Sequence, residues 1–179
     1  MKNITLWTTL AFFIIAFPAQ AQEEFQFTGY IGAGFGMSRL DPDTNNTGFS
    51  VDDTNDFGYK VIAGYDWTPR ISTELYYADL GEAKIKPSGQ VSYQDFGISG
   101  LFYFYHETMD RTGLALFGKI GVGRMDNDSD LPFNRQNDAH ILLGAGGEYS
   151  LARQITLRFE AEFFDEDSQF YSVNLLKRF

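Results

Sequence analysis

Two histidines, His106 and His140, are the side chains of this chain that could act as acid or base near neutral pH. A hydrolase that uses histidine needs a serine or another nucleophile within hydrogen-bond reach of the imidazole. His106 falls in a predicted turn, and His140 falls near the end of a predicted strand. We expect both imidazoles to be solvated, and we expect neither a catalytic residue nor a cofactor.

A second candidate for chemistry is the acidic segment Asp126–Asp130, whose spacing of oxygen ligands is similar to the start of a calcium-binding loop. An EF-hand would need glycine at the sixth position and glutamate at the twelfth, where this chain has Leu131 and Asn137. We therefore expect a solvated acidic loop and no metal site, with weak binding of divalent cations as the alternative. The polar segment Asp41–Asn55 is interpreted in the same way.

Other charged residues lie in segments where polar and apolar side chains alternate. In Ile155–Phe163, Arg158, Glu160 and Glu162 occupy alternate positions between apolar residues. Successive side chains of a β-strand point to opposite faces, so this segment predicts a strand with one charged and one apolar face. A register slip by one residue would move Arg158 to the apolar face, at a cost of roughly 2–4 kcal/mol in the middle of a membrane.

Eight alternating segments recur along the chain, each near the ~10 residues that a tilted membrane strand needs. They cover residues 25–36, 58–65, 71–77, 95–104, 114–123, 140–149, 155–163 and 171–179. In hydrocarbon every backbone amide needs an internal partner, so a sheet with open edges is not viable, whereas eight strands can close around a lumen filled by side chains. The predicted fold class is all-β, an eight-stranded antiparallel up-and-down transmembrane β-barrel.

The connections between these segments alternate in length, three being short and three being longer and polar. The short ones are Trp67–Arg70, His106–Thr112 and Leu151–Gln154, and the long ones are Leu40–Asn55, Gly81–Gln90 and Asp126–Asp138. Short periplasmic turns and long outer loops are typical of an outer-membrane barrel. The fourth outer connection, around Asp165–Gln169, is short, which predicts a lower rim on that side.

The first residues form a separate unit. A positively charged start is followed by the uncharged, largely apolar run Ile4–Phe17, and Ala19 and Ala21 form the small-x-small pattern of a signal-peptidase site. The apolar run is shorter than the ~20 residues of a membrane-spanning helix. We therefore expect a cleaved signal peptide over residues 1–21 and a barrel domain over residues 22–179.

Bulk properties narrow the function classes. A net charge of −10 argues against nucleic-acid binding, which requires a basic face. The chain has no cysteine, so no disulfide stabilises it after export. Aromatic residues make up 17% of the chain although its mean hydropathy is −0.24. Strands with one lipid-facing and one polar face produce this combination.

The inward set of the predicted barrel carries charges of both signs. It comprises Lys60, Glu74, Lys119, Glu148, Arg158 and Glu160. An unpaired charge buried in a narrow lumen costs several kcal/mol, so these residues are expected to form ion pairs. Our hypothesis is that all of them except Lys60 form a central network that blocks the lumen to free diffusion. The alternative is that the pairs only satisfy a polar core.

Outward aromatic residues gather near the strand ends. Those toward the periplasmic rim are Tyr65, Trp67, Phe104, Tyr105, Tyr149 and Phe179, and those toward the outer rim are Phe35, Tyr59, Tyr77 and Phe163. Aromatic side chains at both interfaces of a membrane fix the depth of a barrel. We therefore predict two aromatic girdles.

Several of these segments carry a family likeness. They are Tyr59–Pro69 with its proline-containing turn, Glu74–Tyr77, Gly144–Tyr149, Leu157–Glu160 and the terminal Phe179. Together they resemble the OmpA-like and OmpX-like small outer-membrane barrels, over essentially all of the chain after residue 21. The resemblance implies the barrel fold and implies that the Glu, Arg and Glu of the third and fourth segments occupy lumenal positions.

The resemblance also implies an assembly signal at the C-terminus, recognised by the barrel assembly machinery and periplasmic chaperones. Its residues are Tyr171, Val173, Leu175 and Phe179. Lys177 departs from the family pattern, because it takes an outward position that is usually apolar; near the rim its amine could reach the headgroups. No peptidoglycan-binding segment follows, so the wall-anchoring role of full-length OmpA proteins is not expected.

The expected function is that of a non-enzymatic integral outer-membrane protein of a Gram-negative bacterium. It would act in envelope structure and in surface contact through its outer loops, with a plugged lumen or at most a narrow pore. The alternative is a lipid-modifying barrel enzyme, disfavoured because Leu142 stands two residues after His140 where the lipid A deacylase pattern has serine. A soluble lipocalin-like barrel is disfavoured because the outward residues are aromatic. The expected partners are outer-membrane lipids and lipopolysaccharide, and the chain is expected to be a monomer that binds no nucleic acid.

Overall fold

A computed structural model of the chain describes residues 28–40, 50–53, 55–86, 89–108, 112–129, 138–152, 154–165 and 168–179. Nine strands lie in these ranges: β1 (Thr28–Leu40), β2 (Ser50–Asp53), β3 (Asn55–Thr68), β4 (Ile71–Lys86), β5 (Gly89–His106), β6 (Leu114–Ser129), β7 (Asp138–Ala152), β8 (Ile155–Asp165) and β9 (Ser168–Arg178). Within the described ranges, no helix is long and apolar enough to cross a membrane.

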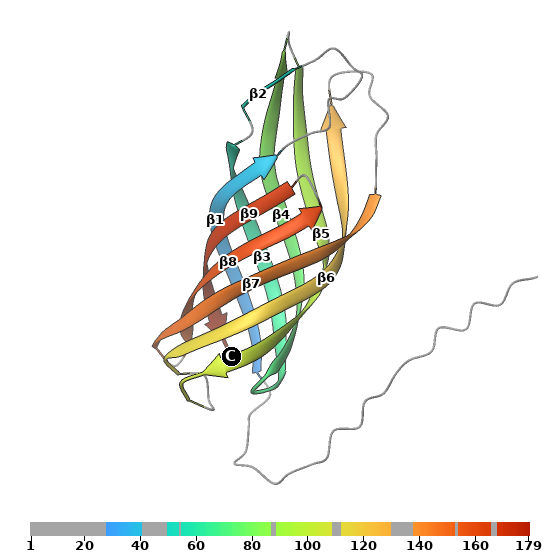
Figure 1. Cartoon of the computed structure of the whole chain (residues 1–179). Helices are drawn as coiled ribbons and strands as arrows, with labels where there is room; N and C mark the ends of the chain where they lie inside the picture. Colours follow the sequence, from blue (N-terminus) through green and yellow to red (C-terminus); the bar gives the residue numbers. More distant parts are fainter. Residues whose placement is uncertain are drawn as a thin grey trace, which may run out of the picture.

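Eight of the strands close into a barrel, and each pairs antiparallel with its neighbours (Figure 1). The first strand of the ring, β1, pairs with the last, β9, from Tyr30 opposite Arg178 to Leu40 opposite Ser168. The pairing of β4 with β5 completes the ring. The predicted eight-stranded up-and-down barrel is therefore confirmed, and each predicted segment lies on a different strand of the ring.

The three predicted long loops are wrong in part, because the structure places paired strand residues within each of them. The segment Gly81–Gln90 was expected to be a loop, but β4 and β5 remain paired as far as Ile85 opposite Gly89. β6 likewise continues to Ser129, into the expected loop Asp126–Asp138. The short strand β2, which is not part of the ring, lies inside the expected loop Leu40–Asn55 and pairs with the end of β4. Beyond the lipid, water contacts both faces of a sheet, so the alternation of side chains ends there. The backbone pairing does not depend on that alternation and continues.

The extension of β4 begins at a bulge. The register of β4 against β5 shifts between Asp79 and Gly81, and Gly81 has a φ of 82°, a conformation that favours glycine. The side chain of Asp79 accepts a hydrogen bond from the Gly81 amide at 3.0 Å.

On the opposite wall the hairpin of β8 and β9 closes at Asp165 opposite Ser168. The low rim predicted for this side of the barrel is confirmed (Figure 1).

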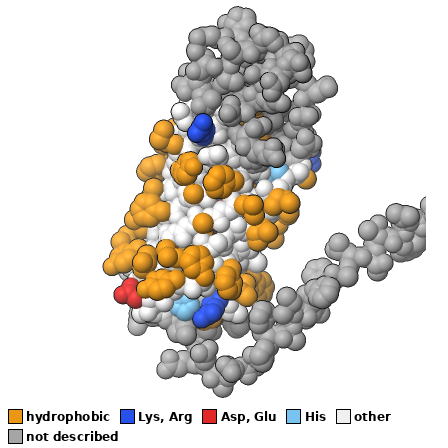
Figure 2. All heavy atoms as spheres, in the orientation of Figure 1, with side chains coloured by type: hydrophobic (Ala, Val, Ile, Leu, Met, Phe, Trp, Pro, Cys, Tyr) orange, Lys and Arg blue, Asp and Glu red, His pale blue; other side chains and the backbone are white. Residues whose placement is uncertain are grey.

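The outer wall of the barrel is apolar. Many of the outward positions of the barrel strands carry exposed hydrophobic side chains, for example Val61 on β3, Leu75 on β4 and Ile120 on β6. On the face seen in Figure 2, hydrophobic side chains form a belt across the wall, and the charged groups of this face lie near its ends. The belt is the surface that hydrocarbon would cover in an outer-membrane barrel, where the apolar band is ~25 Å tall.

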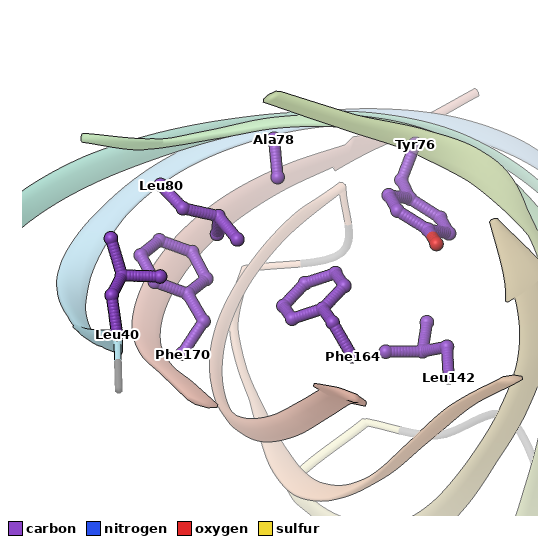
Figure 3. Close-up of a cluster of buried hydrophobic side chains, with 7 residues drawn as sticks. All are labelled: Leu40, Tyr76, Ala78, Leu80, Leu142, Phe164 and Phe170. Carbon is purple, nitrogen blue, oxygen red and sulfur yellow. The ribbon is translucent and has the colours of Figure 1, made fainter. Parts of the chain in front are cut away.

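The lumen is filled with side chains in layers. Nearest the outer rim is an apolar cluster, which we call the upper plug; it consists of Leu40, Tyr76, Ala78, Leu80, Leu142, Phe164 and Phe170. Figure 3 shows these side chains converging on the barrel interior from strands on opposite walls. Two smaller buried clusters lie toward the periplasmic end, one with Leu101, Tyr103, Ala115 and Phe117 and one with Tyr30, Ile62 and Leu176. Charged residues occupy the space between these layers.

Candidate functional site: the charged interior of the barrel

Arg158 stands at the centre of the charged interior. It comes from β8, whose alternation turns Arg158 inward and its neighbours Leu157 and Phe159 outward, and its side chain has no exposed surface. Its guanidinium makes ion pairs with Glu74, across the lumen on β4, and with Glu148, on the neighbouring strand β7. Two guanidinium nitrogens donate to the same carboxylate oxygen of Glu148, Nε at 2.8 Å and Nη2 at 2.5 Å. This geometry suits the fixed donor fork of arginine.

Two lysines pair with the carboxylates above Arg158. The Nζ of Lys119 lies 2.9 Å from Glu74, 3.0 Å from Glu160 and 3.0 Å from Glu162. The Nζ of Lys60 lies 3.0 Å from Glu160 and 2.6 Å from Glu162. Glu160 therefore joins the two lysines, and Glu74 joins Lys119 to Arg158. The charges form one continuous network rather than separate pairs.

Hydroxyl and amide groups complete the hydrogen bonds of the carboxylates. Tyr30 donates to Glu74 at 2.7 Å, and Tyr103 donates to Glu148 at 2.7 Å. The side-chain amide of Asn174 donates to Glu160 at 3.0 Å. Rings also cover Arg158, whose guanidinium carbon lies 5.2 Å from the centroid of the Phe117 ring. Buried charges are tolerated when they are paired and hydrogen-bonded in this way.

A second set of ion pairs lies at the periplasmic end of the lumen. Arg178, the last residue of β9, reaches Asp66 on β3 at 2.6 Å and Glu148 on β7 at 2.7 Å. Neither strand is adjacent to β9 in the ring, so Arg178 ties together the walls on both sides of the closing strand. Glu148 links this set to Arg158. Ser72 donates a further hydrogen bond to Asp66 at 2.6 Å.

The structure brings all six charged residues predicted for the lumen into this network: Lys60, Glu74, Lys119, Glu148, Arg158 and Glu160. Lys60, which the hypothesis left outside the central group, is joined to it through Glu160. Sequence reasoning did not assign Glu162, Asp66 or Arg178 to the network, although each shares the inward parity of its strand.

The prediction that both histidines are solvated is wrong for His140. Its side chain is 7% exposed and points into the lumen, where Nε2 lies 3.5 Å from Oδ2 of Asp95. His140 has the same parity on β7 as Leu142 and Glu148, which are buried, and this parity was the available signal. His106 is the last residue of β5 and is half-buried at the periplasmic rim.

The other predicted sites are described only in part. Within the described ranges, no group of three or more histidine, cysteine or acidic side chains could hold a metal ion. Ala19 and Ala21 of the predicted cleavage site lie outside the described residues. Of the acidic segment Asp126–Asp130, the structure describes only the side chain of Asp126. Of the residues predicted for the assembly signal, Tyr171, Val173 and Leu175 follow the outward face of β9, and Phe179 comes directly after the strand and is exposed. Lys177 also faces outward, with its Nζ 5.6 Å from the centroid of the Phe179 ring.

The aromatic residues predicted for the girdles lie on the outer wall. Near the periplasmic rim, Tyr65 and Trp67 pack edge to face with ring centroids 4.8 Å apart. Near the outer rim, Tyr59 and Tyr77 lie with ring centroids 6.3 Å apart. Phe35 stacks on Phe57 at the same end of the barrel, 5.8 Å between centroids. This placement at both ends of the apolar belt is the one that aromatic girdles require.

The same barrel recurs in solved outer-membrane proteins. OprG of Pseudomonas aeruginosa is 15% identical with a TM-score of 0.63, over 85% of this chain and 95% of that one. Neisserial surface protein A, NspA, is 15% identical with a TM-score of 0.58, over 84% and 97%. The attachment invasion locus protein Ail of Yersinia pestis is 16% identical with a TM-score of 0.56, over 87% and 100%. At these identities the likeness shows the fold alone.

No curated protein matches the sequence. The family model described as "Outer membrane protein beta-barrel domain" matches residues 8–176, which is nearly the whole chain. The match agrees with the closed barrel, its apolar outer wall and its charged interior. The chain belongs to the outer membrane protein beta-barrel domain family.

Proposed function

We propose that this protein is a non-enzymatic outer-membrane barrel with a closed lumen, which serves envelope structure and holds its extracellular segments at the cell surface. The observation that carries the proposal is the filling of the lumen. The network around Arg158 links side chains from β3, β4, β6, β7, β8 and β9, and the upper plug lies above it. A solute would have to break buried ion pairs and displace buried rings in order to pass.

The wall supports the role of a rigid membrane anchor. Eight paired strands leave no edge within the ring, and a closed ring satisfies the backbone amides without water. The paired extension of β4 and β5 rises beyond the belt and would carry surface segments away from the membrane. The outward face of the barrel would contact outer-membrane lipids and lipopolysaccharide, and the barrel would act as a monomer.

Export would follow the usual route of such proteins in a Gram-negative cell. The signal peptide would be cleaved after Ala21, and the C-terminal residues ending in Phe179 would engage the periplasmic chaperones and the assembly machinery. The outward alternation of β9, with Tyr171 and Leu175 exposed on the wall, is consistent with that role. A lipid-modifying enzyme is the competing function, and it would need an acid–base pair accessible to lipid on the outer wall or rim.

The proposal is tested in a Gram-negative host that produces the full chain. We expect the protein in the outer-membrane fraction as a band whose mobility changes on boiling in SDS. We expect the host's lipid A to have the same mass spectrum with and without it, and the outer membrane to remain as slow to admit a chromogenic β-lactam as in cells without the protein. A new lipid A species would establish the enzymatic alternative. A faster entry of the β-lactam would contradict the closed lumen.

A further inference from the structure

Asp95 is a buried carboxylate at the junction of the charged network and the upper plug. It comes from β5 and is 0% exposed. Its Oδ2 accepts a hydrogen bond from the hydroxyl of Tyr76 at 2.9 Å and lies 3.5 Å from Nε2 of His140. Among the residues that the structure describes, His140 is the one basic group within ion-pair distance of Asp95. The lysines and arginines of the network are engaged by other carboxylates.

The buried charges of the lumen are unequal in number. Six carboxylates are buried in the described part of the lumen, namely Asp66, Glu74, Asp95, Glu148, Glu160 and Glu162, against the four cations Lys60, Lys119, Arg158 and Arg178. An unpaired buried charge costs several kcal/mol. A proton on His140 would supply a cation beside the carboxylate that the network leaves out.

The backbone makes room for this contact. Gly123 lies opposite both Gly97 on β5 and His140 on β7. A Cβ at Gly123 would lie 2.5 Å from the Tyr76 hydroxyl oxygen, 2.8 Å from Cε1 of His140 and 3.0 Å from Oδ1 of Asp95. Only a residue without a side chain leaves space for the three groups to converge.

The groups that face His140 come from each wall around it. β5 contributes Asp95, β4 contributes Tyr76, and β8 contributes the apolar Phe164, while β6 presents Gly123. The nearest charges toward the periplasmic end are Lys119 and Glu162. Both lie opposite Gly144, which is two inward positions after His140 on β7. Lys60 pairs with Glu162. On β7 itself Asp138 shares the parity of His140, and its side chain lies outside the description.

The same residues support the upper plug. The ring of His140 packs edge to face on Phe164 with centroids 6.0 Å apart, and the ring of Tyr76 lies 6.2 Å from Phe164. Both Lys60 and Lys119 place their Nζ 5.7 Å from the centroid of the Tyr76 ring. Tyr76 therefore joins the charged network, the Asp95–His140 pair and the plug.

We propose that Asp95 and His140 form a proton-binding site inside the barrel, whose protonated form holds the upper plug in place. With a proton on His140, the imidazolium and the Asp95 carboxylate form a buried ion pair that keeps Tyr76 and Phe164 packed. Without the proton, the buried Asp95 carboxylate keeps only neutral neighbours, the Tyr76 hydroxyl and the imidazole, and no cation beside it, so the upper layer of the lumen is weakened. The inference does not depend on whether the lumen is closed, because its test measures protonation and unfolding.

The sign of the effect follows from proton linkage. An unfolded histidine loses its proton near pH 6.5. Above this pH the folded barrel with a proton on His140 binds one proton more than the unfolded chain, so stability falls as the pH rises. The unfolding equilibrium constant is expected to rise up to about tenfold per pH unit until His140 also loses its proton. Apart from His140, the chain has one histidine, His106, and no cysteine. His106 is therefore the one other side chain that would change charge in this pH range at its ordinary pKa.

The experiment uses the full-length protein purified from outer membranes in detergent. Urea unfolding is measured between about pH 6 and 8 for the wild type, His140→Gln and Asp95→Asn, with His106→Gln as the matched control. We expect the pH dependence in the wild type and in His106→Gln, and its loss in the other two variants. NMR of the imidazole carbons at pH 7, assigned with His106→Gln, is expected to show His140 as imidazolium.

A neutral His140 at pH 7 overturns the proposal, and so does a pH dependence that survives both His140→Gln and Asp95→Asn. If neither of those variants folds, the NMR state of His140 in the wild type still decides the question. Neither result bears on conductance or on lipid A, so a failure here is distinguishable from a failure of the proposed function.

Discussion

Replacing Arg158 with methionine removes the central cation of the lumen while keeping much of its volume. Glu74 would retain Lys119 at 2.9 Å and the Tyr30 hydroxyl at 2.7 Å. Glu148 would retain Arg178 at 2.7 Å and the Tyr103 hydroxyl at 2.7 Å. Removing one partner of a buried ion pair typically costs about 3–5 kcal/mol. Because both carboxylates keep other donors, we expect Arg158→Met to lower the free energy of unfolding by about 3 kcal/mol, the lower end of that range.

Equilibrium unfolding by urea in lipid vesicles measures this loss. Trp67 is the single tryptophan of the chain after residue 21, so its fluorescence follows unfolding in the processed protein. The matched control is Arg70→Met, because Arg70 is exposed in the turn between β3 and β4 and such a change should stay within about 0.5 kcal/mol.

A double variant separates ion pairing from packing. In Arg158→Met with Glu148→Gln the lumen loses a charge of each sign, so we expect less destabilisation than the sum of the two single changes. A loss below about 1 kcal/mol for Arg158→Met, in the range of an exposed ion pair, would refute the reasoning that the network is buried and interdependent. Strictly additive losses in the double variant would refute the direct pairing of Arg158 with Glu148.

Further predictions concern the wall, the tight approaches of the strands and the depth of the barrel. Gly146→Ala should destabilise the barrel by about 1–3 kcal/mol in the same unfolding assay, because a Cβ there would lie 2.4 Å from the carbonyl oxygen of Phe159, whereas Gly118→Ala, with nothing within 4 Å of its Cβ, should be nearly neutral. Ile120→Lys places a charge in the middle of the apolar belt and should cost about 2–4 kcal/mol, while Ile120→Leu should change little; equal stabilities would place that wall away from lipid. The fluorescence of Trp67, 50% exposed at the periplasmic end of the belt, should be quenched more by lipids brominated near the headgroup than by lipids brominated near the chain ends, and the reverse order would mean that the girdle is misplaced.

The wall of the barrel could be predicted from sequence because lipid imposes a pattern of period two. The alternation on β8, with Arg158 and Glu160 inward and Phe159 outward, fixed the facing of that strand without any knowledge of its neighbours. The same pattern disappears above the lipid, where water contacts both faces. The paired continuation of β4 and β5 past Gly81 and the short strand β2 therefore left no signal that alternation could detect.

Partners inside the lumen were harder to predict than facing. Arg158 on β8 pairs with Glu74 on β4, a strand that is distant in the ring as well as in sequence. Such a contact depends on the stagger of all the strands between them. Arg178 was missed because it lies at the end of the last strand, where an exposed side chain is the usual expectation. His140 was judged by its place near a strand end, although its parity with Leu142 pointed inward.

Single-channel recording in planar bilayers tests the central claim, a lumen closed by buried ion pairs and rings, most directly. Purified wild-type barrel should insert without giving a resolved, steady current in either orientation. The double variant Arg158→Ala with Phe117→Ala, which removes the central guanidinium and the ring packed against it, should give openings if it folds. A large and steady conductance of the wild-type protein would contradict the account, because water and ions would then occupy the space assigned here to the network around Arg158.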